Sequence, residues 1–321
     1  MNSNHLKSIF VAAAVCSSGL LAVAAPLKRA DVTTNPAWLL HLDCDALRPT
    51  IIGQHVLSET GKPEAKAKLA AFQTIFHFDL RTQLHGVTVY SESPSPEDGV
   101  LVVYADFDSA RLVTLAQAAK DYQSSDHGSV VIHSWIDEKK TSKDGIKPRT
   151  YAAIKGNRVI FGQREDAVAR ALTVISGSSA NLASTKNFSE LGVSGSTSFI
   201  EAAVRKMKLP DSDPNAAILK MSQSLQLELG ESQKKLNARL TLVADSGEVA
   251  TNVLSIVQGL VSLAKMQNDK PESVKVANAI SLAQEGDRVM ANLVLPAGEA
   301  VEIMKADAAR KAALADKASK E

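Results

Sequence analysis

Three segments in the second half of this chain alternate apolar and polar residues with a period of two. Leu225, Leu227 and Leu229 share one side of the first segment, and residues 236–242 and 289–295 repeat the pattern. Successive side chains of a strand point to opposite faces, so each segment is expected to be a strand with one buried face. Strands of this kind belong to an antiparallel or mixed sheet that is covered on one face.

Helices are expected between these strands. Residues 249–264 carry apolar side chains at helical spacing, and Asp245 or Ser246 can cap the start of that helix. The second half therefore reads strand, strand, helix, strand, strand, helix. The first half shows the same order, with strands at 86–92, 99–105 and 129–136, a hairpin at 150–162, and helices at 109–122 and 165–175.

Two local patterns recur in both halves. Residues 105–109 and 244–248 each lead from a strand into a helix through aspartate, and the turns at Gly156-Asn157 and Gly286-Asp287 each precede an apolar strand and a helix. The fold class expected is α+β, with two related ββαββα-like modules produced by an internal duplication. The sheets should be mostly antiparallel and covered by helices on one face.

The composition of the chain divides it into six parts. A small-residue stretch breaks both periodicities and marks the boundary between the modules. The expected parts are a signal peptide (1–24), a flexible N-terminus (25–36), the first module (37–177), a connector (178–196), the second module (197–305) and a solvated helical tail (306–321).

The N-terminal residues have the layout of a secretory signal peptide. Lys7 precedes apolar residues 9–14 and 20–24, and Ala22-Val23-Ala24 is a small-x-small cleavage pattern. A retained membrane anchor would need about 20 apolar residues, but a Ser-Ser-Gly sequence interrupts this run. Lipidation at Cys16 is the other alternative, and it is disfavoured because Val15 is bulky for the position before a lipidated cysteine. Cleavage after Ala24 predicts a periplasmic or secreted protein without stable membrane insertion.

Charge and cysteine content exclude several classes of protein. Loss of residues 1–24 removes one lysine and no acid, which leaves equal numbers of acidic and basic residues. Nucleic acid is therefore not expected as a partner. Cleavage also leaves Cys44 as the single cysteine, so no intrachain disulfide can form. Its neighbours Asp43 and Asp45 raise rather than lower a thiol pKa, which favours a structural role over a nucleophilic one.

The histidines are the first candidate for chemistry, because the six that would remain all lie between residues 41 and 133. His41 with Asp43, and His77 with Asp79, form two pairs that together could bind a metal through nitrogen and oxygen. The spacing is not specific, so surface or hydrogen-bonded buried histidines are the favoured alternative. No cofactor is predicted.

Two carboxylates are the second candidate. Asp106 and Asp108 lie between a strand and a helix, where α/β folds often place functional residues. Helix capping is the favoured alternative, because the second half has Asp245 at the same place. The sequence contains no G-x-S-x-G, H-E-x-x-H, C-x-x-C, Walker or dinucleotide-binding motif.

With its export signal and paired modules, the chain resembles uncharacterised secreted proteins of environmental bacteria. That resemblance implies α/β modules behind a signal peptide and assigns no activity or functional residue. The leading hypothesis is a non-catalytic extracytoplasmic binding or scaffold module with an unknown partner. One alternative is a hydrolase with an Asp/His site in a cleft between the modules. The other is a carrier that holds an apolar ligand between sheet and helix, because residues 249–264 offer an aliphatic surface.

Overall fold

The computed structural model describes residues 25–138, 145, 147–192, 197–205, 222–267 and 271–318. The expected signal peptide, with Cys16, lies outside the described residues. So do parts of the charged loop after residue 138 and of the expected connector.

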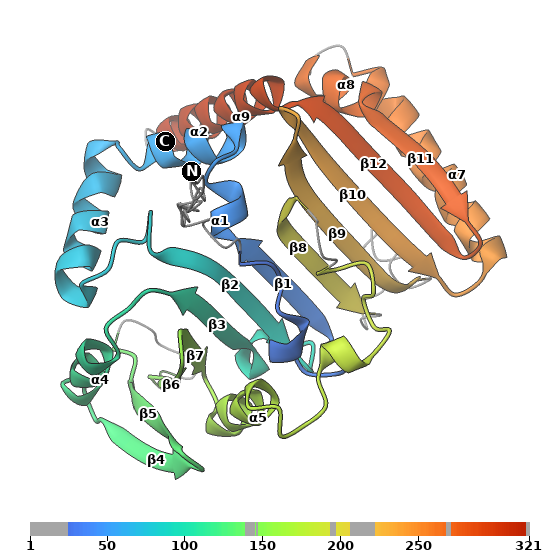
Figure 1. Ribbon diagram of the computed structural model, residues 1–321. Coiled ribbons are helices and arrows are strands. Elements are labelled where there is room, and N and C mark those ends of the chain that lie inside the picture. The colour runs from blue at the N-terminus through green and yellow to red at the C-terminus, as the bar shows by residue number, and fades with distance from the viewer. Residues whose placement is uncertain are drawn as a thin grey trace, which may run out of the picture.

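Within the described ranges, twelve strands form one continuous antiparallel sheet (Figure 1). Their order is β11-β12-β10-β9-β8-β1-β2-β3-β7-β6-β5-β4. The strands are β1 (Trp38–Asp43), β2 (Leu84–Ser91), β3 (Val100–Ala105), β4 (Gln123–His127), β5 (Val130–Ile136), β6 (Arg149–Lys155), β7 (Arg158–Gly162), β8 (Ser198–Arg205), β9 (Ser222–Ser232), β10 (Lys235–Ala244), β11 (Ile280–Glu285) and β12 (Arg288–Pro296). The expected α+β class with antiparallel pairing is confirmed, and the two modules share a single sheet.

The helices lie around this sheet. They are α1 (Cys44–Leu47), α2 (Ile51–Glu59), α3 (Pro63–Phe76), α4 (Ser109–Gln117), α5 (Glu165–Ile175), α7 (Gly247–Lys265), α8 (Pro271–Asn278) and α9 (Ala297–Ala318). Short 3-10 turns are η1 (Arg29–Asp31), η2 (Pro96–Asp98) and η3 (Leu182–Ser184). In Figure 1, α7 runs beside β11 and β12 while α9 and α2 lie together at one end of the strands.

The two halves have the same strand order on either side of the centre. β1 and β8 pair with each other, and outward from them run β2-β3-β7-β6 in the first half and β9-β10-β12-β11 in the second. The first half carries an additional hairpin, β4–β5, beyond β6. Gly156 and Gly286 both have φ of 61°, as the expected hairpin turns require. Each half therefore has the ββαββα-like order that the sequence predicted.

The residues of β7 show that helices cover both faces of the sheet in the first half, so the expectation of helices on one face alone was wrong there. Ile160 packs in the cluster that includes α5, and the neighbouring Val159 and Phe161 line a cavity under α4. Because adjacent residues of a strand point to opposite faces, α4 and α5 lie on opposite sides. We call the face that carries Val159 and Phe161 the α4 face, and the face that carries Ile160 the α5 face.

The largest cluster of buried residues lies on the α5 face. Val168, Ala171 and Leu172 of α5 are at most 1% exposed and pack against β3, β5, β6 and β7. Residues 25–36, which the sequence predicted to be a flexible N-terminus, belong to this region, with Leu27 4% and Val32 0% exposed. That expectation was wrong, because these apolar side chains complete the core beside α5.

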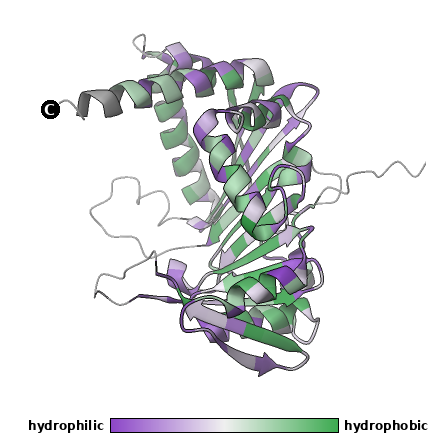
Figure 2. Ribbon diagram, turned by 90° about the vertical axis from the view of Figure 1, so that its left-hand side faces the viewer, coloured by the Kyte–Doolittle hydropathy of each residue, from purple (hydrophilic) through white to green (hydrophobic). Residues whose placement is uncertain are grey.

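Two smaller clusters lie at the ends of the strands in the second half. Leu242 and Val289 pack with Val253 of α7, and Leu295 packs with Val301 of α9 and Ile52 of α2. Ser246 caps α7 by accepting a hydrogen bond from the Val249 amide at 3.3 Å, as one of the two expected capping residues. Hydrophobic residues also continue along the strands between the helices (Figure 2).

Candidate functional site

His41 and Asp43, the first candidate metal-ligand pair, are both buried on β1. The His41 ring bonds to the Thr88 side chain at 2.9 Å and to the backbone oxygen of Ala25 at 2.9 Å. A carbonyl oxygen can only accept, so Nε2 carries the proton and Nδ1 accepts from the Thr88 hydroxyl. Burial lowers the pKa of His41 to about 4, which keeps the ring neutral near neutral pH. The Asp43 carboxylate accepts from the amides of Ala25 and Ala46.

The second candidate pair, His77 and Asp79, follows α3 and does not converge with His41 and Asp43. His77 ends α3 in the left-handed conformation with φ of 58°, and Asp79 binds the side chain of Arg81 at 2.7 and 3.0 Å. The guanidinium of Arg81 lowers the pKa of Asp79. Across the described ranges, no three His, Cys, Asp or Glu side chains converge in a way that could hold a metal ion.

The candidate carboxylates Asp106 and Asp108 line one shallow depression together with His77. Asp108 caps α4, accepting from the amides of residues 110 and 111 at 2.9 and 3.1 Å, which confirms the capping interpretation. Asp106 instead lies 3.0 Å from Nε2 of His85, while Asp45 lies 2.9 Å from Nδ1 of the same ring.

Among the described residues, this Asp45–His85–Asp106 arrangement is the cluster of titratable groups that bears on the hydrolase alternative. Burial lowers the pKa of His85, but the bonds to Asp106 and Asp45 outweigh it and the pKa is raised. Both ring nitrogens face carboxylates, so neither can accept a proton from a nucleophile in this conformation. Nearby Cys44 is no substitute nucleophile, because burial above all raises its pKa to about 11. The arrangement connects α1 to β2 and the end of β3.

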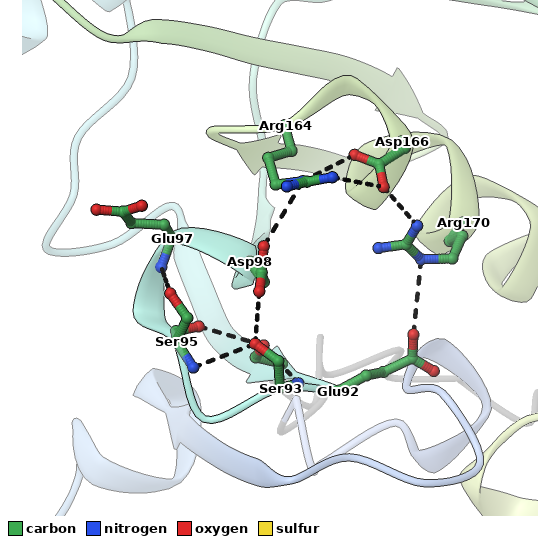
Figure 3. A network of polar contacts seen from close by, with 9 residues as sticks. Glu92, Ser93, Ser95, Glu97, Asp98, Arg164, Asp166 and Arg170 are labelled. Carbon is green, nitrogen blue, oxygen red and sulfur yellow. Dashed lines mark hydrogen bonds and ion pairs between the residues drawn. The ribbon is translucent and has the colours of Figure 1, made fainter.

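A polar cavity of about 260 Å³ lies where β2 and β3 meet the start of α5. Figure 3 shows its rim, in which two arginines alternate with acids. Arg170 lies 2.7 Å from Asp166 and 3.6 Å from Glu92, and Arg164 lies 3.0 Å from Asp166 and 3.6 Å from Asp98. The two arginines lower the pKa of Asp166 to about 2. Each arginine of this rim is thus paired with two of the three carboxylates.

Two buried hydroxyl groups line the same cavity. Thr33 is 6% and Tyr90 2% exposed, and within the described ranges their oxygens have no hydrogen-bond partner. Buried polar atoms are almost always paired with protein or ordered water. Water molecules or small polar groups in this cavity would supply hydrogen-bond partners for these hydroxyls.

An apolar cavity of about 400 Å³ lies on the α4 face. Helix α4 forms one wall and strands β5, β6 and β7 form the other, with the end of α3 closing one side. The lining residues are almost all aliphatic or aromatic: Ile75, Phe76, Leu112, Val113, Leu115, Ala116, Ala119, His133, Trp135, Ala152, Ile154, Val159 and Phe161. Ligand pockets have volumes of about 300–1,000 Å³ and mostly apolar linings, and this cavity meets both criteria.

His133 is the polar side chain in that lining. Its Nδ1 lies 2.9 Å from the hydroxyl of Tyr122, and burial lowers its pKa, so the ring is neutral near neutral pH. The ring therefore presents a hydrogen-bonding group without a charge. Such a group would orient a ligand with one polar end.

Two rows of apolar side chains cross the α4 face from strand to strand. Directly paired residues of antiparallel strands lie on the same face, so the register defines both rows. The first contains Leu282, Ala291, Leu240, Leu227, Ala202, Leu40, Val89, Leu101, Phe161 and Ala152, and the second contains Ile280, Leu293, Ala238, Leu229, Ile200, Leu42, Val87, Val103, Val159 and Ile154. Near the middle, Leu40 is 45% and Leu240 38% exposed. The rows lead from the α4 cavity toward β11.

A groove of about 650 Å³ lies at the far end of these rows, between α7, α8 and α9. Ile280, at the end of the second row, forms part of its floor. Along α7, the neighbouring Ile256, Leu260 and Leu263 are 44%, 54% and 62% exposed. Within the described residues, α7 alone is long and apolar enough to cross a bilayer by length and composition, and 11% of that stretch is buried.

Sequence reasoning missed the residues that build these cavities. Leu112 belonged to an expected helix and Phe161 to an expected hairpin, but their convergence depends on how α4 crosses the sheet. Arg164 and Arg170 were not considered as parts of a cavity, because only the fold brings them together with Glu92 and Asp98. Trp135 could have indicated the apolar cavity, because it is a large side chain in a strand to which the sequence analysis assigned no functional role.

No protein-family model matches the chain, and no curated protein matches it. Among solved structures, three crystal forms of TP0453 are similar in outline. Form III has a TM-score of 0.46 at 11% identity, covering 88% of this chain and 98% of that one. Form I has a TM-score of 0.46 at 9% identity, with coverages of 87% and 96%. Form IV has a TM-score of 0.44 at 13% identity, with coverages of 90% and 99%.

Proposed function

We propose that this is an exported, non-catalytic binding protein that carries an apolar ligand in the cavity beneath α4. The observation that carries the proposal is the cavity of about 400 Å³ with its almost wholly apolar lining. Protein interiors are packed as densely as organic crystals, and voids much larger than a water molecule are few. A cavity of this size therefore favours an occupant over a packing defect.

The lining suggests the chemistry of the occupant. None of the described lining residues is charged, so a charged group inside the cavity would lose its hydration without compensation and has to remain in the water outside it. The neutral His133 ring can bind one polar atom. The two apolar rows continue from the cavity across the open middle of the α4 face. An elongated molecule such as the acyl chain of a fatty acid fits this combination.

Export is part of the proposal and depends on the sequence of residues 1–24. A carrier of acyl chains works in an aqueous compartment, where such molecules are poorly soluble. The equal numbers of acidic and basic residues after cleavage suit a protein that recognises its ligand through apolar contact.

The carrier hypothesis drawn from the sequence placed the ligand at residues 249–264, and the proposed cavity lies elsewhere, beneath α4. The groove beside α7 is a second apolar surface on the same face, but it is more open.

The test uses the fluorescence of Trp135, which lines the cavity. The chain has two tryptophans, so Trp38→Phe isolates the signal of Trp135. Laurate should change its emission in a saturable way. Ala116→Phe, which places a ring in the cavity, should weaken laurate binding by about tenfold or more, equivalent to about 1.4 kcal/mol.

Ala110→Phe is the matched control, because Ala110 is an exposed residue of the same helix. It should leave laurate binding unchanged. Equal binding by Ala116→Phe and the parent protein would show that the ligand does not occupy this cavity. Absence of any saturable change with fatty acids of several lengths would refute the carrier function itself.

A further inference from the structure

Ala25, the residue after the expected cleavage site, is held in the folded protein through both of its backbone polar groups. It is 7% exposed, its nitrogen lies 3.3 Å from Oδ1 of Asp43, and its oxygen accepts from Nε2 of His41 at 2.9 Å. Gly86 makes room for it, because a Cβ at Gly86 would lie 3.3 Å from the Cβ of Ala25. Ala25 thus occupies a buried site that hydrogen-bonds both of its backbone polar groups and has room for its side chain.

The partner of the Ala25 nitrogen is a carboxylate in an acidic environment. Asp43 is 2% exposed, and within the described ranges its carboxylate is paired with backbone amides and with no lysine or arginine. Burial raises its pKa, and the neighbouring Asp45 adds to the effect. Glu201, which pairs with His41 across the sheet, has its pKa raised to about 7, chiefly by burial and in part by Asp43. A positive charge at this place would compensate a buried negative one.

We propose that the bond between Ala24 and Ala25 is hydrolysed during export and that the α-ammonium group thus formed is bound by Asp43. A peptidase of the export machinery adds water across the amide bond. Ala24 leaves with a new carboxylate, and Ala25 keeps the nitrogen, which takes up a proton and becomes an ammonium. The single N–H donor of the peptide is replaced by a charged group with three donors.

Two independent observations place the cut at this bond. The Ala22-Val23-Ala24 pattern selects it from the sequence alone. The structure supports the same bond, because the Ala25 nitrogen faces a buried carboxylate that is paired with no cation among the described residues. Since Ala25 is buried once folded, cleavage has to precede the folding of this segment. This inference rests on the proposed export and is independent of the ligand proposed for the α4 cavity.

The first experiment is mass spectrometry of the exported chain, which should begin at Ala25. The second compares the thermal stability of a chain that begins at Ala25 with one that begins at Ala24. The extra residue moves the ammonium by about 3.8 Å and restores the peptide amide, so the longer chain should melt at a lower temperature. In the Asp43→Asn background that difference should vanish.

A third measurement covers the case in which Asp43→Asn does not fold, because Asp43 also caps α1. An amine-reactive ester near neutral pH should label the Ala25 terminus about tenfold or more slowly in the folded protein than in urea. The Ala24 terminus should lack this protection. An exported chain with a different first residue, or equal labelling of both termini, would overturn the proposal.

Discussion

Asp31 connects the segment before β1 to the core of the first half, and its removal tests whether that segment is part of the fold. Its carboxylate accepts from the Tyr104 hydroxyl at 2.9 Å and from Nε of Arg158 at 2.7 Å. Tyr104 is 1% exposed, so its hydroxyl cannot turn to water when the acceptor is lost. Arg158 keeps 23% of its side chain exposed and can be partly rehydrated.

We expect Asp31→Ala to lower the free energy of unfolding by about 3 kcal/mol. Removing one partner of a buried ion pair costs about 3–5 kcal/mol, and the partial exposure of Arg158 places this pair at the low end. Urea denaturation followed by circular dichroism would measure the loss as a shift of the midpoint by about 1–3 M, since m is about 1–3 kcal/mol/M.

The control is Asp166→Ala, which removes a carboxylate from an exposed pair with Arg170. Exposed pairs contribute about 0–1 kcal/mol, so this variant should unfold close to the parent. In a Tyr104→Phe background, Asp31→Ala should cost about 1 kcal/mol less, because no hydroxyl is left without an acceptor. If Asp31→Ala costs no more than Asp166→Ala, the segment before β1 is not held as the structure indicates.

Three further perturbations have defined outcomes. The raised pKa of His85 means that its bonds stabilise the fold fully below its unfolded pKa of about 6.5 and less as pH rises through the folded value. His85→Gln should therefore cost about 1 kcal/mol at pH 5–6 and progressively less at alkaline pH, in chemical denaturation. Gly53→Ala should destabilise α2, because the added Cβ would lie 1.9 Å from the backbone oxygen of Leu47. Gly259→Ala in α7 places its Cβ in open space and should stabilise the protein by about 0.5–1 kcal/mol. A higher melting temperature for Gly53→Ala than for Gly259→Ala would contradict this geometry. Cys44, with its pKa raised to about 11, should react with iodoacetamide at pH 8 about tenfold or more slowly than in the unfolded chain, and equal rates would show that the thiol is accessible.

The proposed ligand site uses the part of the first half that differs from the second. His133 and Trp135 lie on β5, in the hairpin that follows α4. In the second half, the corresponding stretch after α7 forms α8. The shared strand order supports the proposal that the two halves arose by duplication, and the difference between hairpin and helix explains why each half encloses a different apolar space.

Much of the secondary structure could be read from the sequence because it is a local property. The alternation in residues 225–229, 236–242 and 289–295 identified β9, β10 and β12, and the capping role of Asp108 followed from its place before an apolar helix. Helices α2 and α3 were not identified. None of the 14 residues of α3 is buried, and alanines on several sides of this helix weaken the one-sided apolar pattern that identifies a helix in sequence.

The sequence by itself determined the class of fold and the pairing of hairpins, and it predicts the bond at which a signal peptide would be removed. These depend on residue order within a few positions, which sets side-chain direction and turn geometry. The tertiary structure determined three contacts that no local sequence pattern predicts. His41 and Asp43 hydrogen-bond to the backbone of Ala25, and Asp45 and Asp106 both contact His85. Helix α4 and strand β7 line a common apolar cavity. Each of these brings together residues far apart in the chain, and their contact depends on strand order and on the face that each helix covers.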